Sequence, residues 1–227
     1  LLTGTRGVGK TTIARILDAG ATDDGVPYSA MELVRGESIT AYCDAKQLDL
    51  DARLDLFVEV CRAVQHAHIN GVIHRDLKPS NILISTVDGR AQPRVIDFGI
   101  AKVIEAAGPA GGAETMHTAF GSVIGTLEYM SPEQASGGAT PVDTRSDVYA
   151  LGVILYELVS GSLPFDSAAL RNAGAIEAQR LIRDTDPPTP ARRFTTSDTR
   201  ETSARARGTD ARTLRRRLDG DLGWITM

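Results

Sequence analysis

The 227-residue chain has 42% hydrophobic and 24% charged residues, an ordinary composition for one soluble domain with a sizeable core or for two small ones. Its net charge of −4 gives no overall reason to expect nucleic acid or an anionic membrane as a partner. No apolar run has the length of a membrane span and no signal peptide precedes the first motif, so we expect no membrane segment. The two cysteines make a reduced, cytoplasmic setting the default expectation. Neither the cysteines nor the histidines have the spacing of metal ligands.

The first feature along the chain is a glycine-rich loop within LLTGTRGVGKTTIARIL. The stretch from Gly4 to Thr11 fits the pattern G-x-x-x-x-G-K-T, in which Gly4 and Gly9 let backbone N–H groups face phosphate oxygens. In such a loop Lys10 reaches the β- and γ-phosphates and Thr11 ligates Mg²⁺. The string resembles the P-loop of bacterial DNA polymerase III clamp-loader subunits over about 17 residues. After Leu17, DAGATDDG breaks the helix that should continue from such a loop.

Two strands, a long helix and a hairpin are expected next. ARILDAG and PYSAMELV predict short strands, joined by the turn-forming sequence TDDG. Apolar residues at helical spacing after Asp49 predict an amphipathic helix that ends near Asn70, with Asp49 as its cap. NILI and RVIDF flank a DGR turn and predict a hairpin. The residues expected on the buried face of the helix are Leu54, Phe57, Val58, Cys61, Val64 and Ala67.

The second half of the chain begins with a segment rich in Gly, Ala and Thr, from Ile104 to Gly125, which predicts a mobile loop. SPEQ then predicts the start of a helix, with Ser131 as its cap and Gln134 three residues later. SDVYALGVILYELVSG is apolar nearly all round and predicts a buried helix that ends at Gly161. The last forty residues are Arg-rich and weakly patterned. LRRRLDGDLGWITM indicates one short helix with Trp224 turned inward.

Three motifs occur in order along this pattern: HRDLKPSN at 74–81, DFG at 97–99 and SPE at 131–133. The first follows the long helix, the second follows a short strand, and the third closes a flexible loop and opens a helix. With these motifs the chain resembles the protein-kinase family, most closely bacterial Ser/Thr kinases, over roughly residues 13–227. The resemblance implies an α+β, protein-kinase-like fold: a mainly α-helical C-lobe with remnant strands of the N-lobe.

The resemblance also implies catalytic roles for five residues. Asp76 would accept the proton of a substrate hydroxyl, and Lys78 would contact the transferring phosphate. Asn81 and Asp97 would hold two Mg²⁺ ions, because the hairpin between them brings the two positions together. Thr126 in GTLEYMSPE would line the substrate pocket near Asp76. Taken without their motifs, Asp76 and Asp97 would be interpreted as helix-cap or turn residues, and the motifs reverse that interpretation.

Further residues have supporting roles in the resemblance. Arg75 would meet a phosphate on the activation loop, where Thr115, Thr118 and Ser122 are the candidate acceptors. Asp147 would bind the backbone of the catalytic loop, and His74 is expected to be a packed structural histidine rather than a base. MELV resembles the hinge that receives adenine. In such a hinge Met31 would be the gatekeeper, and the backbone groups of Glu32 and Val34 would face the adenine ring.

Some parts of the family pattern are absent from the sequence. The family's small lobe supplies a glycine-rich loop over the phosphates, a lysine on a strand and a glutamate on a helix. This chain has four lysines, and Lys10 alone precedes the hinge, within the P-loop-like segment rather than on an apolar strand. We therefore expect very weak ATP binding and negligible transfer by this chain. No last helix follows Met227, so we also expect Glu133 to lack the arginine that partners it in the family.

The sequence is interpreted as three parts: residues 1–13, a P-loop-like segment foreign to the rest; residues 14–36, an N-lobe remnant and hinge; and residues 37–227, a kinase C-lobe truncated before its last helix. The implied cofactors are ATP and Mg²⁺, and the implied partner is a protein with a Ser or Thr acceptor. Nucleic acid is not expected, because the nine arginines from Arg192 onward are interleaved with acidic residues. Two alternatives remain: a clamp-loader-like P-loop NTPase, and a non-catalytic binding module built on the kinase lobe.

Overall fold

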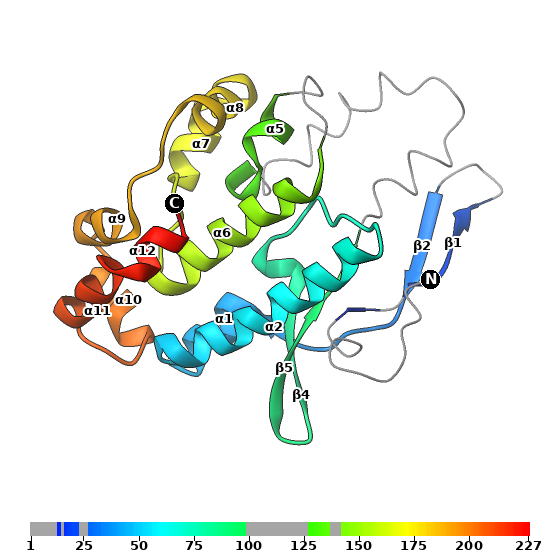
Figure 1. Cartoon of the computed structure of the whole chain (residues 1–227), viewed down its shortest axis with the longest axis horizontal. Helices are drawn as coiled ribbons and strands as arrows, with labels where there is room; N and C mark the ends of the chain where they lie inside the picture. The colour runs from blue at the N-terminus through cyan, green and yellow to red at the C-terminus, as the bar shows by residue number, and fades with distance from the viewer. Residues whose placement is uncertain (1–12, 15, 23–26, 99–126, 137–141) are drawn as a thin grey trace.

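The computed structural model describes residues 13–14, 16–22, 27–98, 127–136 and 142–227 (Figure 1). Helices make up most of this part, and the strand pair nearest the N-terminus lies at one end of the molecule. Several sequence predictions fall outside the described residues. These are the P-loop-like residues Gly4, Gly9, Lys10 and Thr11, most of the TDDG turn, Gly99, the loop from Ile104 to Gly125 with Thr115, Thr118 and Ser122, and Thr126.

The two strands expected near the N-terminus are present. Strand β1 (Ile16–Ala21) pairs antiparallel with β2 (Pro27–Met31). A second sheet has the order β3-β4-β5, formed by Glu37–Ser38, Ile82–Val87 and Arg90–Val95. Ile13 forms a parallel bridge with Val95, and the Ala14 N–H donates to the Val95 carbonyl at 2.9 Å. The chain is thus tied to the second sheet from residue 13 onward.

The predicted hairpin is the pair β4–β5, and its turn explains its register. Asp88 and Gly89 have φ values of 50° and 74°, as a two-residue turn of the kind favoured in hairpins requires. The resulting register places Ile82 opposite Val95. The next bond, from the Ile96 N–H to the Asn81 carbonyl, is 2.9 Å long. The hairpin therefore carries the residues just before β4 and just after β5 to one place.

Two long helices form the centre of the molecule. Helix α2 (Leu50–Ile69) begins at its predicted cap, because the Asp49 carboxylate accepts the Ala52 N–H. Helix α6 (Thr144–Ser160) packs against it and ends, as predicted, at Gly161. A Cβ at Gly161 would lie 2.6 Å from the Ser203 hydroxyl, and φ there is 80°, so only glycine fits. The prediction that Val58 lies on the buried face of α2 is wrong, since this residue is 43% exposed.

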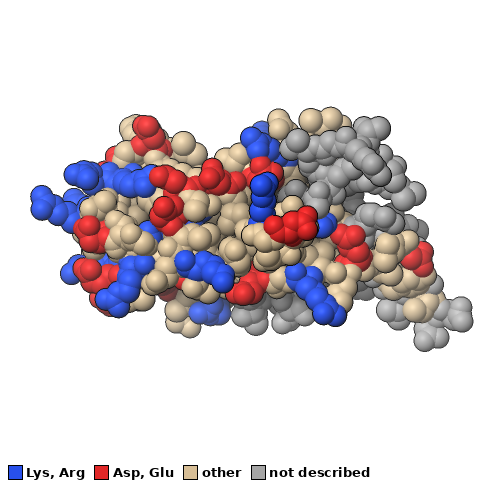
Figure 2. All heavy atoms as spheres, turned by 90° about the horizontal axis from the view of Figure 1, so that it is seen from below, with Lys and Arg blue, Asp and Glu red and all other residues tan. Residues whose placement is uncertain are grey.

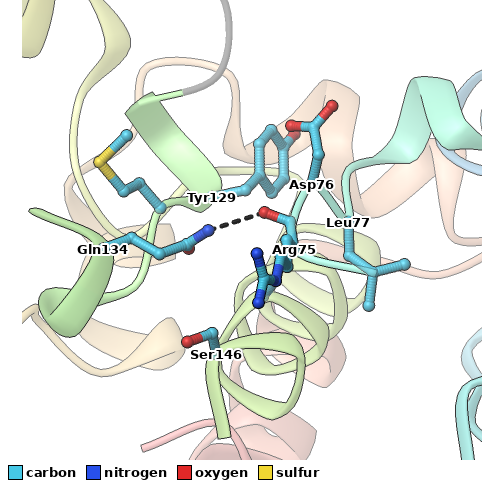
Figure 3. A pocket seen from close by; sticks show the side chains of 8 residues that line it. Arg75, Asp76, Leu77, Tyr129, Gln134 and Ser146 are labelled. Carbon is cyan, nitrogen blue, oxygen red and sulfur yellow. Dashed lines mark hydrogen bonds between the residues drawn. The ribbon is translucent and has the colours of Figure 1, made fainter. Parts of the chain in front are cut away.

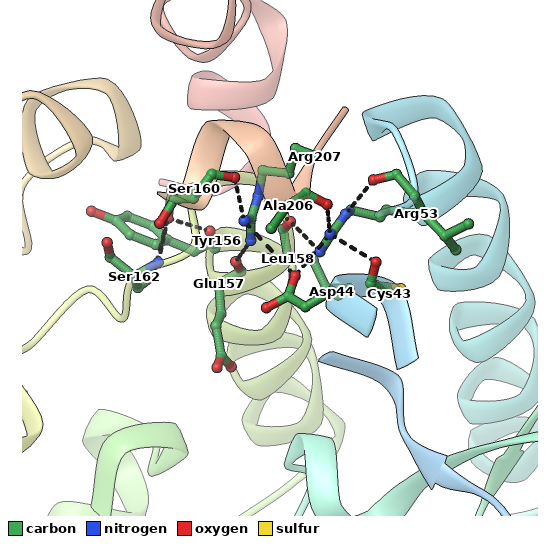
Figure 4. Close-up of polar contacts among 12 residues, drawn as sticks. Cys43, Asp44, Arg53, Tyr156, Glu157, Leu158, Ser160, Ser162, Ala206 and Arg207 are labelled. Carbon is green, nitrogen blue, oxygen red and sulfur yellow. Dashed lines mark hydrogen bonds and ion pairs between the residues drawn. The ribbon is translucent and has the colours of Figure 1, made fainter. Parts of the chain in front are cut away.

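Two buried arginines join these helices to the rest of the fold (Figure 4). Arg53 donates to the carbonyls of Leu48, Cys43 and Ala206, and Arg207 donates to those of Leu158, Ser203 and Glu157. Their shared carboxylate is Asp44, which lies 2.8 Å from Arg53 and 3.9 Å from Arg207. Burial lowers the pKa of Arg207 to about 10, so it remains charged at neutral pH. We call Arg53, Arg207 and Asp44 the arginine clamp.

The clamp has a simple electrostatic basis. The last carbonyls of a helix have no partner within the helix and carry the negative end of its dipole. Glu157 and Leu158 lie in the last turn of α6, and both of their carbonyls accept from Arg207. The clamp therefore satisfies a buried helix end with charged donors. It also binds the end of α1 (Ile39–Ala45), a helix that begins at the Ser38 cap, because Arg53 donates to the Cys43 carbonyl and pairs with Asp44.

The C-terminal region is more regular than its sequence suggested. After α7 (Ser167–Ala173) and α8 (Ala175–Asp184) come α9 (Pro190–Thr196), α10 (Arg200–Ala206), α11 (Ala211–Leu218) and α12 (Asp221–Ile225). The prediction that Trp224 turns inward is wrong, since its side chain is 82% exposed. Helix α12 packs against the core through Leu222 and Gly223. Successive helical residues point about 100° apart, so Trp224, the next residue, faces away from the core.

The arginines of this region lie on a mixed-charge surface. Arg217 pairs with Asp51 at 2.6 Å, Arg193 with Asp166 at 3.2 Å, and Arg215 with Asp219 at 3.7 Å. Figure 2 shows basic and acidic side chains interspersed over the face that it draws. Among the helices that the structure describes, none is long and apolar enough to cross a membrane.

Candidate active site

The site is built on the loop that follows α2, and the carboxylate of Asp147 binds the backbone of this loop. Asp147 lies in the first turn of α6 and is 1% exposed. Its two oxygens accept the N–H groups of His74 and Arg75, each at 2.8 Å. The Nε2 atom of His68 lies 2.7 Å from the same carboxylate. Arg75 has a φ of 71°, a strained value for a residue with a side chain, and these bonds hold it there.

His74 is a packed structural residue, as expected. Its Nε2 lies 2.8 Å from the Ile96 carbonyl, which can only accept, so Nε2 carries a proton. Its Nδ1 accepts the Asp76 N–H at 3.3 Å and is therefore unprotonated. Burial lowers the pKa of His74, and the ring lies 4.6 Å from that of Phe98. A neutral imidazole with both nitrogens in use has no proton to give or take at a substrate.

Three predicted site residues meet at the surface above this support. The Lys78 ammonium lies 2.7 Å from Asp76 Oδ2. Asn81, in the short 3₁₀ helix η1 (Pro79–Asn81), donates its Nδ2 to the Asp76 carbonyl at 2.8 Å and to Asp76 Oδ2 at 3.2 Å. Asn81 is 5% exposed, whereas the Asp76 side chain is 43% exposed. The carboxylate of Asp76 is thus oriented by two donors and is still open to a ligand.

Asp97 is the fourth member of the group. It follows β5 directly after Ile96, whose N–H is bonded to the Asn81 carbonyl, and it has a φ of 64°. Because the amide nitrogen of Asn81 is bonded to Asp76, its amide oxygen is the atom left for a cation. One amide oxygen and one carboxylate suit Mg²⁺, which uses few protein ligands and takes the rest from phosphate and water. Within the described residues, no group of three or more His, Cys, Asp or Glu side chains could hold a metal.

A cavity of about 220 Å³ adjoins these residues (Figure 3). Asp76 and Arg75 line it from the loop, and Tyr129 lines it from η4 (Leu127–Tyr129). Gln134, in α5 (Pro132–Ala135), donates to the Arg75 carbonyl at 2.7 Å and completes the predicted capping box with Ser131. The Nε atom of Arg75 is buried and has no hydrogen-bond partner among the described residues. The remaining lining residues are Leu77, Met130, Ser146 and Ala150.

The expected hinge leaves β2 and runs to the β3-β4-β5 sheet. Met31 ends β2 and is half-buried, and Val34 is also half-buried. The Glu32 carboxylate lies 3.3 Å from Arg94 of β5. A Cβ at Gly36 would lie 2.5 Å from the Ile84 carbonyl, so the chain passes close against β4 only because this residue is glycine. These contacts fix the strand that follows the hinge to the hairpin that carries Asn81 and Asp97.

Glu133, the acidic residue of SPE, has a partner that the motif did not predict. Its carboxylate accepts the Ser146 hydroxyl at 2.5 Å, which links α5 to the start of α6. In the described part of the chain it forms no ion pair with an arginine. Sequence reasoning also missed Tyr129 and its hydrogen bond of 2.7 Å to Glu157, because nothing in the spacing of two residues 28 positions apart marks them as neighbours.

The chain is similar to known proteins of one family. The profile of the family described as "Protein kinase domain" matches residues 6–207. "Serine/threonine-protein kinase Pkn1" of Myxococcus xanthus is 40% identical over 184 residues, which is 81% of this chain and 24% of that protein. "Serine/threonine-protein kinase pkn3" of the same organism is 42% identical over 183 residues, which is 78% of this chain and 31% of that protein.

A solved structure shares the fold. The crystal structure of a mutant form of the Mycobacterium tuberculosis PknI kinase domain superimposes with a TM-score of 0.53 at 22% identity, over 92% of this chain and 71% of that one. At this identity the likeness concerns the fold. The present chain spans only 24% and 31% of the lengths of the two Myxococcus xanthus relatives.

Proposed function

This chain belongs to the protein kinase family, and we propose that its native reaction is transfer of the γ-phosphoryl group of ATP to a Ser or Thr hydroxyl of a protein. The observation that supports this most strongly is the group of Asp76, Lys78, Asn81 and Asp97. Asp76, Lys78 and Asn81 are in contact, and the backbone bond from Ile96 to Asn81 supports the placement of Asp97 beside them. The chain is similar to bacterial Ser/Thr kinases, and this similarity favours Ser or Thr as the acceptor.

In this proposal the tasks of transfer are divided among the residues of the group. Asp76 accepts the proton of the acceptor hydroxyl, and Asn81 keeps the Asp76 carboxylate turned toward it. Lys78, paired with Asp76, neutralises charge on the group being transferred. Thr126 would line the acceptor pocket, and Arg75, whose Nε has no partner among the described residues, would receive an activation-loop phosphate. Asp147 positions the loop and does not touch substrate.

Members of this family generally use ATP and Mg²⁺. We propose that Asn81 and Asp97 hold the cation, and that Met31, Glu32 and Val34 lie along the adenine. When bound, Mg-ATP supplies the phosphoryl group and the metal ions offset its charge. The lysine count limits this part of the proposal. Within these 227 residues Lys10 is the one lysine before Lys46, so we propose that a purified chain of this length offers the α- and β-phosphates no strand lysine and binds ATP weakly.

We propose that residues 14–36 form the strand pair and hinge of a small lobe, and residues 37–227 the large lobe. For residues 1–13 we propose a foreign, P-loop-like segment resembling a clamp-loader subunit. The support is the fit of Gly4 to Thr11 to the P-loop pattern, whereas Ile13, the last residue of the segment, already pairs with β5. The family match begins at residue 6, inside this segment. A reduced, cytoplasmic setting is proposed from the two free cysteines, Cys43 and Cys61.

The proposal is tested by following transfer of radiolabel from γ-labelled ATP to a mixture of Ser and Thr peptides, at Mg-ATP concentrations well above 1 mM to offset low affinity. We expect slow transfer that Asp76→Asn abolishes. The matched control is Asp198→Asn, an exposed aspartate between α9 and α10, which should leave the rate unchanged. Transfer that is equal in the wild type and in Asp76→Asn would contradict the proposal. Loss of transfer in both variants would also contradict it, because Asp198 is remote from the site.

A further inference from the structure

The peptide units on both sides of Arg75 are held by side chains from two other elements. Its N–H donates to Asp147 of α6 at 2.8 Å, and its carbonyl accepts the Nε2 group of Gln134 of α5 at 2.7 Å (Figure 3). Its left-handed backbone, with a φ of 71°, is a conformation that persists where the surroundings hold it from more than one direction. Asp76, the proposed base, is the next residue, so this support sets where its side chain begins.

The amide of Gln134 is fixed in one orientation by two different partners. Its Oε1 accepts the N–H of Ser131, which is fully buried, at 3.0 Å. Its Nε2 then faces the Arg75 carbonyl, which can only accept. The bond to Ser131 belongs to the capping box, a local motif that glutamate serves as well as glutamine. The bond to Arg75, 59 positions away in the chain, requires the amide N–H group that glutamine alone of the two provides.

The residue before Gln134 ties the same short helix to α6. The Glu133 carboxylate accepts the Ser146 hydroxyl at 2.5 Å, and Ser146 precedes Asp147, which binds the Arg75 N–H. These contacts close a ring through α5, the loop and α6. Three members of the ring line the cavity beside the proposed base: Arg75, Gln134 and Ser146. The ring therefore joins one wall of the cavity to the loop that carries this base.

We propose that Gln134 is a positioning residue for phosphoryl transfer. Its amide holds the Arg75 carbonyl, and thereby keeps the cavity wall made by η4 and α5 at a set distance from the Asp76 carboxylate. The inference rests on the proposed kinase function and adds to it a residue that acts through the loop. Proton transfer to Asp76 requires the acceptor hydroxyl within hydrogen-bond reach, so a wall that shifts by about 1 Å lowers the rate steeply.

The test is Gln134→Glu, which keeps the shape of the side chain and the acceptor for the Ser131 N–H. At pH 8 the introduced carboxylate faces the Arg75 carbonyl with a lone pair instead of a donor. Transfer of radiolabel from γ-labelled ATP to a saturating serine peptide should fall about tenfold. The dissociation constant for Mg-ATP should stay within about twofold of the wild-type value, because the proposed nucleotide residues are unchanged. Gln65→Glu, at an exposed glutamine of α2, is the matched control and should keep the wild-type rate.

A pH profile separates this bond from a general loss of structure. When protonated, the introduced carboxyl carries an O–H that can donate to the Arg75 carbonyl, while its other oxygen still accepts from Ser131. The deficit of Gln134→Glu relative to the wild type should therefore shrink from about tenfold at pH 8 to about threefold or less at pH 5. Groups that titrate in both chains cancel in this ratio. The charged residues of the ring and of the cavity lining are Arg75, Asp76, Glu133 and Asp147.

Gln134→Met is the second variant, and it carries the test if Gln134→Glu does not fold. It lacks both amide groups and has no charge, so we expect a loss of about tenfold that is the same at pH 8 and at pH 5. Circular dichroism melting of each variant verifies folding.

The outcomes separate this inference from the proposed function. Wild-type rates in Gln134→Glu and Gln134→Met overturn the positioning role and leave the kinase proposal standing. A deficit in Gln134→Glu that is equal at pH 8 and pH 5 also overturns it, since the lost bond to Arg75 would not be the cause. A loss that lies in Mg-ATP affinity instead of the transfer rate overturns it as well. If the wild-type chain transfers no label to any serine or threonine peptide, both the inference and the proposed function are wrong.

Discussion

The loop at residues 74–81 and the arginine clamp are both polar networks with buried members, but they use their hydrogen-bonding groups differently. In the clamp, two buried guanidinium groups donate to backbone carbonyls, and the half-exposed Asp44 is already paired with them. At the loop, a buried carboxylate, Asp147, accepts backbone N–H groups, while the side chains of Asp76 and Lys78 remain partly exposed at 43% and 22%. The difference teaches that support and site can be told apart by which polar atoms remain open to a ligand.

The largest effect should come from breaking the clamp. Arg207→Met removes the charged donor shared by the carbonyls of Glu157, Leu158 and Ser203. Among the described residues, Glu157 then keeps only the Gly161 N–H and Leu158 only a long contact of 3.5 Å with Arg53, so we expect the free energy of unfolding to fall by about 3 kcal/mol or more. Urea denaturation followed by circular dichroism measures this. Arg205→Met, an exposed neighbour on the same helix, should change stability by less than about 0.5 kcal/mol. Equal losses in the two variants would show that the clamp has no special role.

A smaller effect is expected at the support of the loop. Asp147→Asn keeps the shape of the side chain but replaces one of two accepting oxygens with a donor that faces an N–H group. We expect a loss of about 1.5–3 kcal/mol, together with faster amide hydrogen exchange at His74 and Arg75. Exchange measured by NMR would locate the change. If protection at these two amides stayed as in the wild type, Asp147 would not be what holds Arg75 at its strained φ.

The smallest effect sharpens the comparison through pH. Because burial lowers the pKa of His74 in the folded chain below the ordinary value of about 6.5, the unfolded chain takes up the proton first. The stability due to neutral His74 is therefore complete above pH 6.5 and is lost as the pH falls below that value. Urea denaturation at pH 7.5 and pH 5 should show this loss in the wild type and in His66→Gln, but a smaller one in His74→Gln. An unchanged pH slope in His74→Gln would mean that the imidazole is not held neutral.

The sequence predicted the fold class and the contacts within its motifs, but it did not predict several contacts between distant segments. The order of HRDLKPSN, DFG and SPE, with a turn-forming DGR between two apolar runs, was enough to expect that Asn81 and Asp97 converge. The capping box at Ser131 was predictable for the same reason, because its chemistry is local. Motifs of this kind express contacts between near neighbours or around one tight turn.

The rest depends on contacts between distant segments. In the sequence, Arg53 resembles a solvent-facing arginine of an amphipathic helix. In the fold it is buried and donates to the carbonyls of Leu158 and Ala206, which lie more than 100 positions away. Trp224 looks like a core residue, but Leu222 and Gly223 already provide the inner face of α12. Apolar periodicity indicates how much surface a helix can bury, and tertiary packing decides which side is used.

The central claim is that the nucleotide site of this chain is built on Asp97 and its neighbours rather than on the P-loop-like segment. Isothermal titration of the purified chain with Mg-ATP tests it most directly. We predict a dissociation constant of about 1 mM or weaker, which Asp97→Asn abolishes and Lys10→Ala leaves unchanged. Micromolar binding, or ATP binding that survives Asp97→Asn and disappears in Lys10→Ala, would contradict the account.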